Sequence, residues 1–285
     1  MMNILIVIDQ YYPIGGGIQQ YIRGLSQTLT EQDHTITILT KTIEGQPTQE
    51  KSPEATIIRT PILEDTLPHP EVMLERWSQL VPIIEDLQPD VVYANNHTSI
   101  GSILAAKEAS IPAVYCCHGW GLFCPLKIRL LKPDESLCYN ERSLENCLRC
   151  QDMQQEPVPP QIKGMGRTLI KSIYWRLNWQ SIRRQDFAPQ VKRYDQFQSI
   201  LESADARIGD SMLTASMFTT KEHTHGVYYG VNFDEFFTVD SQPFRERYGL
   251  DDNPYITLVG RVHPTKGHEW AIRALQYLPQ NMKLV

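Results

Sequence analysis

Short apolar runs recur along the chain at the spacing of an α/β protein. Residues 3–8 form a β-branched apolar run that does not alternate with polar positions, a pattern typical of a strand covered on both faces. Further strand-like runs lie at residues 35–40, 56–59, 89–94, 111–116 and 226–232, and residues 203–211 are interpreted as a helix end, a strand and a turn.

Helical periodicity separates these runs. After the first strand, apolar residues fall at Ile18, Tyr21, Ile22, Leu25 and Leu29, which is the spacing of one face of a helix. Helices are also predicted at residues 72–87, 100–109 and 212–221. Strands that alternate with helices predict a doubly wound, Rossmann-like parallel sheet, in which ligands bind at the carboxyl ends of the strands.

The first strand leads into a glycine-rich turn, Gly15, Gly16 and Gly17, which opens onto the first helix. Unpaired N–H groups at such a helix start can bind an anion, although a tight turn without a ligand has the same pattern. The turn does not fit a dinucleotide site. Gln20 occupies the third small position of that fingerprint, and the second strand ends in Thr40 and Lys41 without a carboxylate.

Two later loops should reach the same edge of the sheet. Residues 95–97 follow the strand at 89–94, and residues 117–119 follow the strand at 111–116. We select Asn96 and His118 from these loops as candidate ligand-binding residues. His118 could hydrogen-bond a substrate hydroxyl or a developing charge, or it could be a loop histidine satisfied by the backbone.

A second strand–glycine–helix pattern closes the chain. Residues 255–259 form a strand, a loop with Arg261 and Lys266 follows, and residues 270–275 continue as a helix before a further strand at 281–285. A planar guanidinium and a point charge suit a diphosphate, with a solvated loop as the alternative. We therefore divide the chain into a first domain at 1–232, a linker at 233–253, and the start of a second Rossmann-like domain at 254–285.

Composition narrows the class of protein. The 285 residues carry a formal net charge of −6, which disfavours a general nucleic-acid binder. Without a run as long as a membrane span, or a leader-like start, the sequence favours a cytoplasmic protein.

The cysteines gather in an excursion at residues 120–160 of the first domain. Cys124, Cys138, Cys147 and Cys150 could supply four thiolates to a structural zinc ion. Buried thiols or a redox pair are the alternatives, and Cys116 and Cys117 are predicted to be core residues. We do not expect a catalytic metal here, because protein thiolates would fill all four ligand positions.

Residues 161–194 are basic and aromatic, with eight Lys or Arg residues against Asp186. Leu169, Ile173 and Leu177 fall on one helical face. Such a helix could contact an anionic membrane from the cytoplasmic side as a peripheral protein, or a phosphorylated acceptor, or could pack on the core with a solvated basic face.

Taken together and in order, these motifs resemble glycosyltransferase family 4, the large retaining group with the GT-B fold. Pro13 with the three glycines resembles the first loop of the family, and His34 resembles its Gly-His element, with Asp33 in place of the glycine. The middle strands with His118, the Tyr-Gly-Val-Asn sequence at 229–232, and the loop from Gly260 to Gly267 extend the resemblance over the whole chain.

The resemblance implies a retaining transfer of sugar from a nucleoside-diphosphate sugar to a glycan, lipid or small-molecule acceptor, as in polysaccharide or glycoconjugate biosynthesis. It implies no metal requirement for catalysis. Arg261 and Lys266 would stabilise the leaving diphosphate, His118 would contact the transferred sugar, and Gly16 and Gly17 would let the backbone approach the reacting centre.

One departure from the family pattern matters. No Glu-x7-Glu element follows Lys266, because Glu269 is the one acidic residue after it. We therefore expect this chain to be a fragment without the donor pocket and with little transferase activity by itself. The alternative function is non-catalytic binding of a nucleotide or glycan by the same fold.

Overall fold

The computed structural model describes residues 1–64, 72–96, 99–119, 121, 123–124, 138, 143, 145–148, 150, 183–230, 239–250, 254–262 and 266–285. The chain divides into two compact units, unit 1 (Met1–Tyr229) and unit 2 (Gly230–Val285). The division falls between Tyr229 and Gly230, close to the position 232 at which the sequence places the end of the first domain. The identity of each unit as an acceptor or donor domain stays a prediction.

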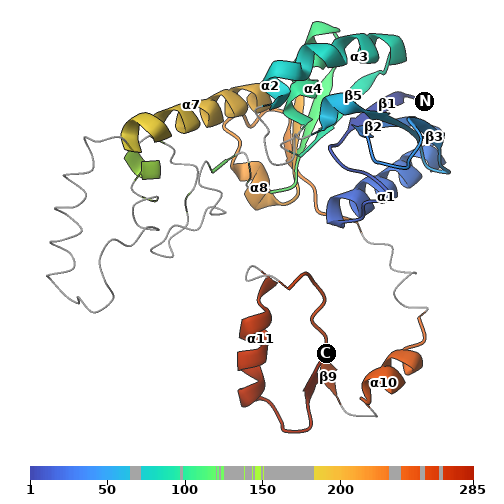
Figure 1. Cartoon of the computed structure of the whole chain (residues 1–285), viewed down its shortest axis with the longest axis vertical. Helices are drawn as coiled ribbons and strands as arrows, with labels where there is room; N and C mark the ends of the chain where they lie inside the picture. Colours follow the sequence, from blue (N-terminus) through green and yellow to red (C-terminus); the bar gives the residue numbers. More distant parts are fainter. Residues whose placement is uncertain are drawn as a thin grey trace, which may run out of the picture. The chain divides into compact units, whose positions relative to one another are not determined.

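Unit 1 is built on one mostly parallel sheet (Figure 1), which confirms the predicted doubly wound fold. In the described part of the chain the strands lie in the order β3-β4-β2-β1-β5-β6-β7-β8, and β3 alone runs antiparallel to its neighbour. Their bounds are β1 (Asn3–Val7), β2 (Thr35–Lys41), β3 (Gln49–Lys51), β4 (Thr56–Thr60), β5 (Val91–Asn95), β6 (Ala113–Cys117), β7 (Ala206–Gly209) and β8 (Thr224–Gly226).

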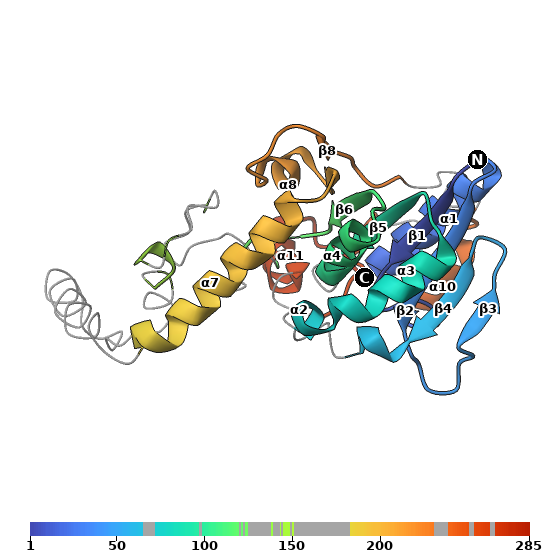
Figure 2. The ribbon, with the colours of Figure 1, turned by 90° about the horizontal axis from the view of Figure 1, so that it is seen from above.

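Helices cover both faces of this sheet (Figure 2). They are α1 (Gly17–Glu31), α2 (Val72–Arg76), α3 (Val81–Leu87), α4 (Ile100–Glu108), α7 (Arg183–Glu202) and α8 (Met212–Ser216), with short 3-10 turns at Pro61–Leu63 and Trp77–Leu80. The predicted single helix at 72–87 is thus two helices and a turn. Pro82 opens α3, because a proline fits the first helical turn but cannot continue a helix from before it.

Alternate residues of β1 belong to two separate cores. Leu5 and Val7 pack with α4 and α7, whereas Ile6 and Ile8 pack with Ile22 of α1. The side chains of these three β1 residues and of Ile8, which follows the strand, are almost completely buried. This two-sided burial explains why the first apolar run has no polar alternation.

Carboxylates and a buried guanidinium fix the amino ends of the strands. Asp90 accepts a hydrogen bond from the Asn3 N–H at 2.6 Å, and Asp205 accepts one from the Ala113 N–H at 2.8 Å. Arg207 donates to the carbonyls of Glu202, Ala204 and Glu222 from a position that is 3% exposed. These contacts align the strands, so their opposite, carboxyl ends are also aligned.

Unit 2 contains α10 (Gln242–Tyr248), β9 (Tyr255–Ile256), α11 (His268–Ala274), a 3-10 turn at Leu275–Tyr277, and β10 (Lys283–Leu284). β9 and β10 pair in parallel, so the strand, helix and strand form one βαβ unit of the kind predicted for residues 254–285. The sequence did not predict α10, which lies in the segment interpreted as a polar linker. Gly249 ends α10 in a left-handed conformation.

Several strand and helix boundaries differ from the predictions; β9, for example, ends at Ile256 rather than at residue 259. β3 lies in a segment interpreted as a loop, α8 ends at Ser216 rather than at 221, and β8 ends at Gly226, where the predicted strand begins. The shift of β8 has a packing reason, since a Cβ on Gly226 would lie 2.6 Å from the Met212 sulfur. The glycine marks the close approach of the strand to α8, not its start.

The close contact between β7 and α8 gives a stability prediction. A Cβ at Gly209 would lie 2.3 Å from the backbone nitrogen of Ala215, so Gly209→Ala should lower the free energy of unfolding by at least about 2 kcal/mol. The matched control is Gly24→Ala in α1, where nothing lies within 4 Å, and which should raise stability by up to about 1 kcal/mol. Urea denaturation measures both, and equal stability of the two variants would contradict the described packing.

Candidate functional site

The candidate site lies at the carboxyl ends of the central strands of unit 1. β1 pairs with β2 on one side and β5 on the other, so the order of the sheet reverses between β1 and β5. Ligands of doubly wound proteins bind at such a switch point. The glycine turn follows β1, Asn95 ends β5, and His118 follows β6, as the sequence predicted for the three loops.

His118 is held by side chains rather than by the backbone. Its Nε2 lies 3.0 Å from Asn95 Oδ1, and its Nδ1 lies 2.6 Å from the Tyr229 hydroxyl. Asn95 is itself fully buried and donates from Nδ2 to the Tyr93 carbonyl at 3.2 Å. The interpretation of His118 as a loop histidine satisfied by the backbone is therefore wrong.

Burial lowers the pKa of His118 to about 4, and the opposing charge of Asp210 raises it less. The imidazole is therefore neutral at physiological pH. A neutral ring can exchange hydrogen bonds with a ligand but supplies no positive charge to a phosphate. Because it is neutral, His118 cannot act as a cationic anion-binding residue.

Aromatic rings surround this histidine. The Tyr21 ring from α1 lies 5.2 Å from the His118 ring and 4.9 Å from the Tyr229 ring, measured between centroids. The Tyr21 hydroxyl also lies 3.0 Å from the Tyr93 hydroxyl. Burial raises the pKa of the Cys116 thiol to about 11, so this thiol stays protonated and is not a nucleophile. Cys116 and Cys117 are buried, as the sequence predicted for core residues.

The glycine turn has room around it. A Cβ on Gly15 or Gly17 would meet no atom within 4 Å, whereas on Gly16 it would lie 2.6 Å from Oε1 of the Gln19 side chain. Gly16 is extended, with φ −179°, so its backbone does not demand glycine. Packing within the described chain therefore does not explain Gly15 or Gly17, whereas a ligand close to the backbone would.

The segment before the turn is well anchored. Gln19 donates to the Gln10 carbonyl at 2.9 Å, and the Tyr12 hydroxyl donates to Gln20 at 2.7 Å. Arg59, which is 4% exposed, donates to the Tyr12 carbonyl at 3.1 Å and to Glu50 at 2.6 Å. The glycines thus extend from a rigid base.

Asn96, the residue selected from the second loop, has a left-handed backbone with φ 66° and donates its N–H to the Cys116 carbonyl. The residue that contacts His118 is its neighbour Asn95, which the sequence analysis did not select. The register of the sheet would have identified Asn95, because this residue pairs with Cys116 near the end of β6, the strand that precedes His118. His97 lies outside the described residues.

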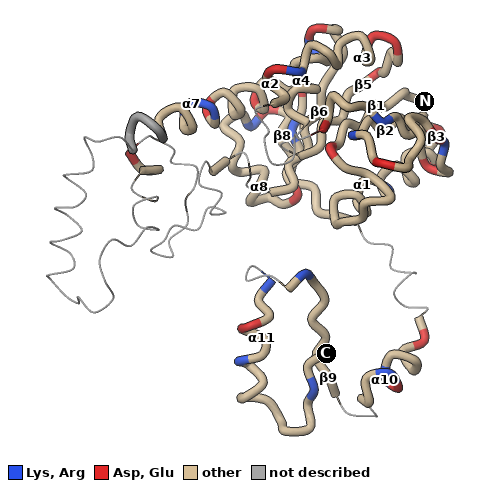
Figure 3. The backbone as a smooth tube through the Cα atoms, viewed as in Figure 1, with Lys and Arg blue, Asp and Glu red and all other residues tan. Residues whose placement is uncertain are grey.

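Arg261 and Lys266 lie in unit 2 on the loop between β9 and α11. Both are exposed, and the Lys266 side chain lies next to Gly260, with its Cδ 3.8 Å from a Cβ built there. Blue segments flank the grey break before α11 in Figure 3. The structure thus places the two cations at the ends of one short loop, and their diphosphate contact stays a prediction.

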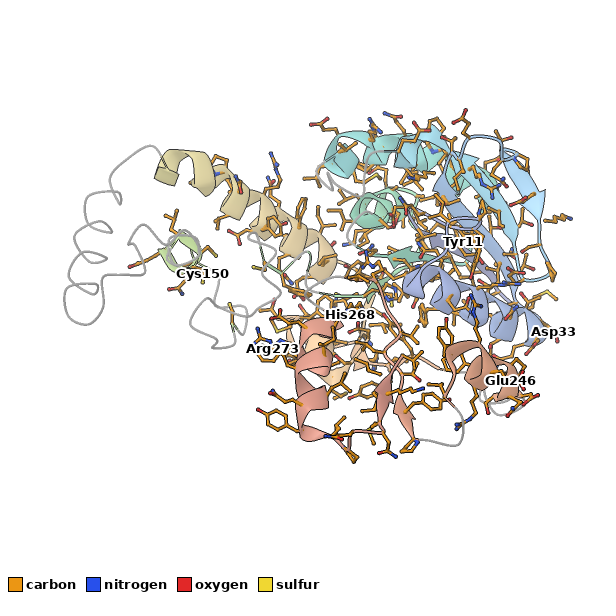
Figure 4. The ribbon with its side chains drawn as sticks, turned by 60° about the horizontal axis from the view of Figure 1, so that its bottom comes forward. Tyr11, Asp33, Cys150, Glu246, His268 and Arg273 are labelled. Carbon is orange, nitrogen blue, oxygen red and sulfur yellow. The ribbon has the colours of Figure 1, made fainter. Side chains whose placement is uncertain are left out.

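The four cysteines of the excursion lie in one region of unit 1. Burial raises the pKa of the Cys147 thiol to about 11, and the charges of Cys124, Cys150 and Cys138 also raise it. Cys150 lies on the same short helical segment (Figure 4). All six cysteines of the chain are described and none forms a disulfide. Among the described residues, however, no group of three or more His, Cys, Asp or Glu is arranged to hold a metal ion.

The basic segment predicted to contact a membrane or an acceptor falls largely outside the described residues. Of residues 161–194, only those from 183 onward are described, as the first part of α7. The contact stays a prediction. A search of the described helices finds none long and apolar enough to cross a membrane.

The segment that carries this site is similar to a known protein family. The model of Glycosyltransferase Family 4 matches residues 15–149, which include the glycine turn, Asn95 and His118. The predicted resemblance is confirmed for this segment. No curated protein matches the sequence.

Solved structures with the GT-B fold cover nearly the whole chain. Sucrose-phosphate synthase from Thermosynechococcus elongatus aligns with a TM-score of 0.60 and 17% identity over 100% of this chain and 61% of its own. A glycosyltransferase from Rickettsia africae aligns with a TM-score of 0.54 and 15% identity, over 97% of this chain and 57% of its own. Starch synthase IV from Arabidopsis thaliana, bound to ADP and acarbose, aligns with a TM-score of 0.54 and 10% identity, over 97% of this chain and 66% of its own. At these identities the likeness shows the fold, and the chain spans about three fifths of each structure's length.

The low pKa of His118 predicts a pH effect on stability. Below about pH 6.5 an unfolded histidine binds a proton, but the folded ring does not until about pH 4. The free energy of unfolding should therefore decrease as the pH is lowered from about 6.5 to about 4. The slope should be up to about 1.4 kcal/mol per pH unit relative to His118→Gln.

Urea denaturation at several pH values measures this difference between the two proteins. Above pH 6.5 the difference should be constant, because the histidine is neutral in both states. A wild-type stability that rises relative to His118→Gln as the pH falls would show that the folded ring is charged.

Proposed function

We propose that this protein is a glycosyltransferase that moves a sugar from a nucleoside-diphosphate sugar to a glycan, lipid or small-molecule acceptor with retention. The observation that carries the proposal is the pairing of a neutral His118 with an unobstructed glycine turn at the switch point of the sheet. Both features lie in the segment that matches the family.

Each element has a role in this proposal. His118 exchanges a hydrogen bond with the sugar, and the glycine turn lets the backbone approach the reacting centre. Arg261 and Lys266 stabilise the charge that develops on the leaving diphosphate, an electrostatic contribution that needs no divalent metal. Acceptor choice lies in unit 1, and the predicted low activity of the isolated chain stays a prediction.

Non-catalytic binding of a nucleotide or glycan is the second candidate, because the same geometry supports binding without transfer. Transfer of the sugar to any acceptor favours the first candidate. In the full-length protein, stabilisation by a nucleotide sugar that is never consumed, even with acceptors present, favours the second.

The glycine turn provides the test of the site. In the full-length protein, at millimolar concentration, one donor from a panel of UDP-, GDP- and ADP-sugars should raise the melting temperature by about 2–4 °C. Gly17→Ala should lose most of this shift without loss of intrinsic stability, because its methyl group would enter the space left for the ligand.

Gly24→Ala is the matched control, since it adds the same methyl group to an exposed position of the same helix. This variant should keep the whole ligand-induced shift. Equal shifts in the two variants would contradict a ligand at the glycine turn, and the absence of a shift with every donor would contradict nucleotide-sugar binding.

We also propose that Cys124, Cys138, Cys147 and Cys150 bind a structural zinc ion. Four thiolates are a donor set that zinc favours, and the electrostatic influence of the other three on Cys147 supports their proximity. Since the described sulfurs are not arranged as ligands, binding would have to draw them together.

The purified protein should then contain about one zinc per chain by mass spectrometry of the metal. A chelator should lower its melting temperature, and Cys147→Ser should reduce the zinc content whereas Cys116→Ser should not. A metal-free protein whose melting temperature does not change when the chelator is added would contradict the zinc site.

A further inference from the structure

The two ring nitrogens of His118 have partners that fix its tautomer. Asn95 donates from Nδ2 to the Tyr93 carbonyl, so its Oδ1 faces His118 Nε2 at 3.0 Å. An amide oxygen only accepts hydrogen bonds, so Nε2 must carry the proton. Because the ring is neutral, Nδ1 then has a lone pair and accepts from the Tyr229 hydroxyl at 2.6 Å.

This assignment restricts what a ligand can offer to His118. Nε2 is committed to the fully buried Asn95, which leaves Nδ1 as the ring nitrogen for a ligand. Nδ1 can only accept, so the partner must be a donor such as a hydroxyl group. A diphosphate or carboxylate oxygen without a proton does not satisfy it.

Tyr229 occupies that acceptor in the structure. Its ring is stacked on His118 with centroids 5.7 Å apart and an interplanar angle of 28°, yet the residue is 44% exposed. Asp210 Oδ2, at 3.5 Å, is a second acceptor close to the same hydroxyl. The phenol can therefore leave His118 and still find a partner.

The position of Tyr229 in the chain is also informative. Tyr229 is the last residue of unit 1, and Gly230 begins unit 2. β8 ends at Gly226, and the Val227 N–H still donates to the Gly209 carbonyl of β7, so the backbone pairing of the described residues stops two positions before Tyr229. A residue at the start of the connection between the units thus contacts the central histidine of the site.

We propose that the Tyr229 hydroxyl is an internal stand-in for the ligand hydroxyl that His118 recognises. It keeps Nδ1 as an acceptor while the site is empty of ligand, and it moves to Asp210 when a sugar hydroxyl takes its place. Tyr229 is thus a positioning residue that competes with the ligand. The assignment of the hydroxyl to a sugar rests on the proposed function, whereas the contact itself does not.

The contact is tested by nitrogen-15 NMR of the His118 ring in the whole chain. In the wild type, Nε2 should have the chemical shift of a protonated nitrogen and Nδ1 that of an unprotonated, hydrogen-bonded one. Tyr229→Phe should move the Nδ1 signal toward that of a nitrogen without a hydrogen-bond donor. Tyr228→Phe, the matched control at an adjacent residue that is 69% exposed, should leave both signals in place.

The competition is tested by binding of UDP-glucose, GDP-mannose and ADP-glucose to the full-length protein, each compared with UDP, GDP or ADP alone. Tyr229→Phe should tighten binding of the recognised nucleotide sugar about three- to tenfold, the range of one net hydrogen bond. Binding of the nucleotide alone, and all binding by Tyr228→Phe, should not change.

A protonated Nδ1 in the wild type, or an Nδ1 signal that ignores Tyr229→Phe, would overturn the tautomer and the contact. Weaker or unchanged binding of the nucleotide sugar by Tyr229→Phe would overturn the competition. If no nucleotide sugar binds either protein, the sugar assignment and the proposed function both fail, and the NMR result alone decides whether Tyr229 holds His118.

Discussion

The hydrogen bond between Asn95 and His118 is the interaction on which the site depends. Asn95 is fully buried at the end of β5, and its amide is oriented by the Tyr93 carbonyl on the same strand. The Tyr93 carbonyl thus fixes the orientation of the Asn95 amide, and the amide oxygen fixes the proton of the imidazole on Nε2. Burial keeps the ring neutral. What the other nitrogen can bind follows from these three constraints.

The parallel sheet places this interaction next to the glycine turn. Its strand order reverses between β1 and β5, so the turn after β1 and Asn95 at the end of β5 lie on adjacent strands. The two cores on either side of β1 hold the strand rigidly, and Arg59 braces the segment that carries the glycines. Gly15 and Gly17 are not needed for packing, which is why a ligand is their simplest explanation.

The local parts of this arrangement could be predicted from sequence. The uninterrupted apolar run of β1, the glycines and the helical spacing of α1 each lie within one short window, and parallel topology then brings His118 to the same edge. Asn95 was missed in favour of Asn96, because the predicted strand ended one residue too early and strand boundaries are not sharply encoded. Tyr21 and Tyr229 were missed because they reach His118 from far along the chain, and no local pattern encodes such a contact.

Whether a sugar lies against His118 and its aromatic neighbours can be measured directly. Saturation-transfer difference NMR with UDP-, GDP- and ADP-glucose reports which ligand protons contact the protein. Sugar binding at His118 predicts strong transfer to sugar protons for one donor in the wild type, and selective loss of that transfer in His118→Gln. Transfer confined to the nucleotide base, or sugar signals that persist unchanged in His118→Gln, would contradict it.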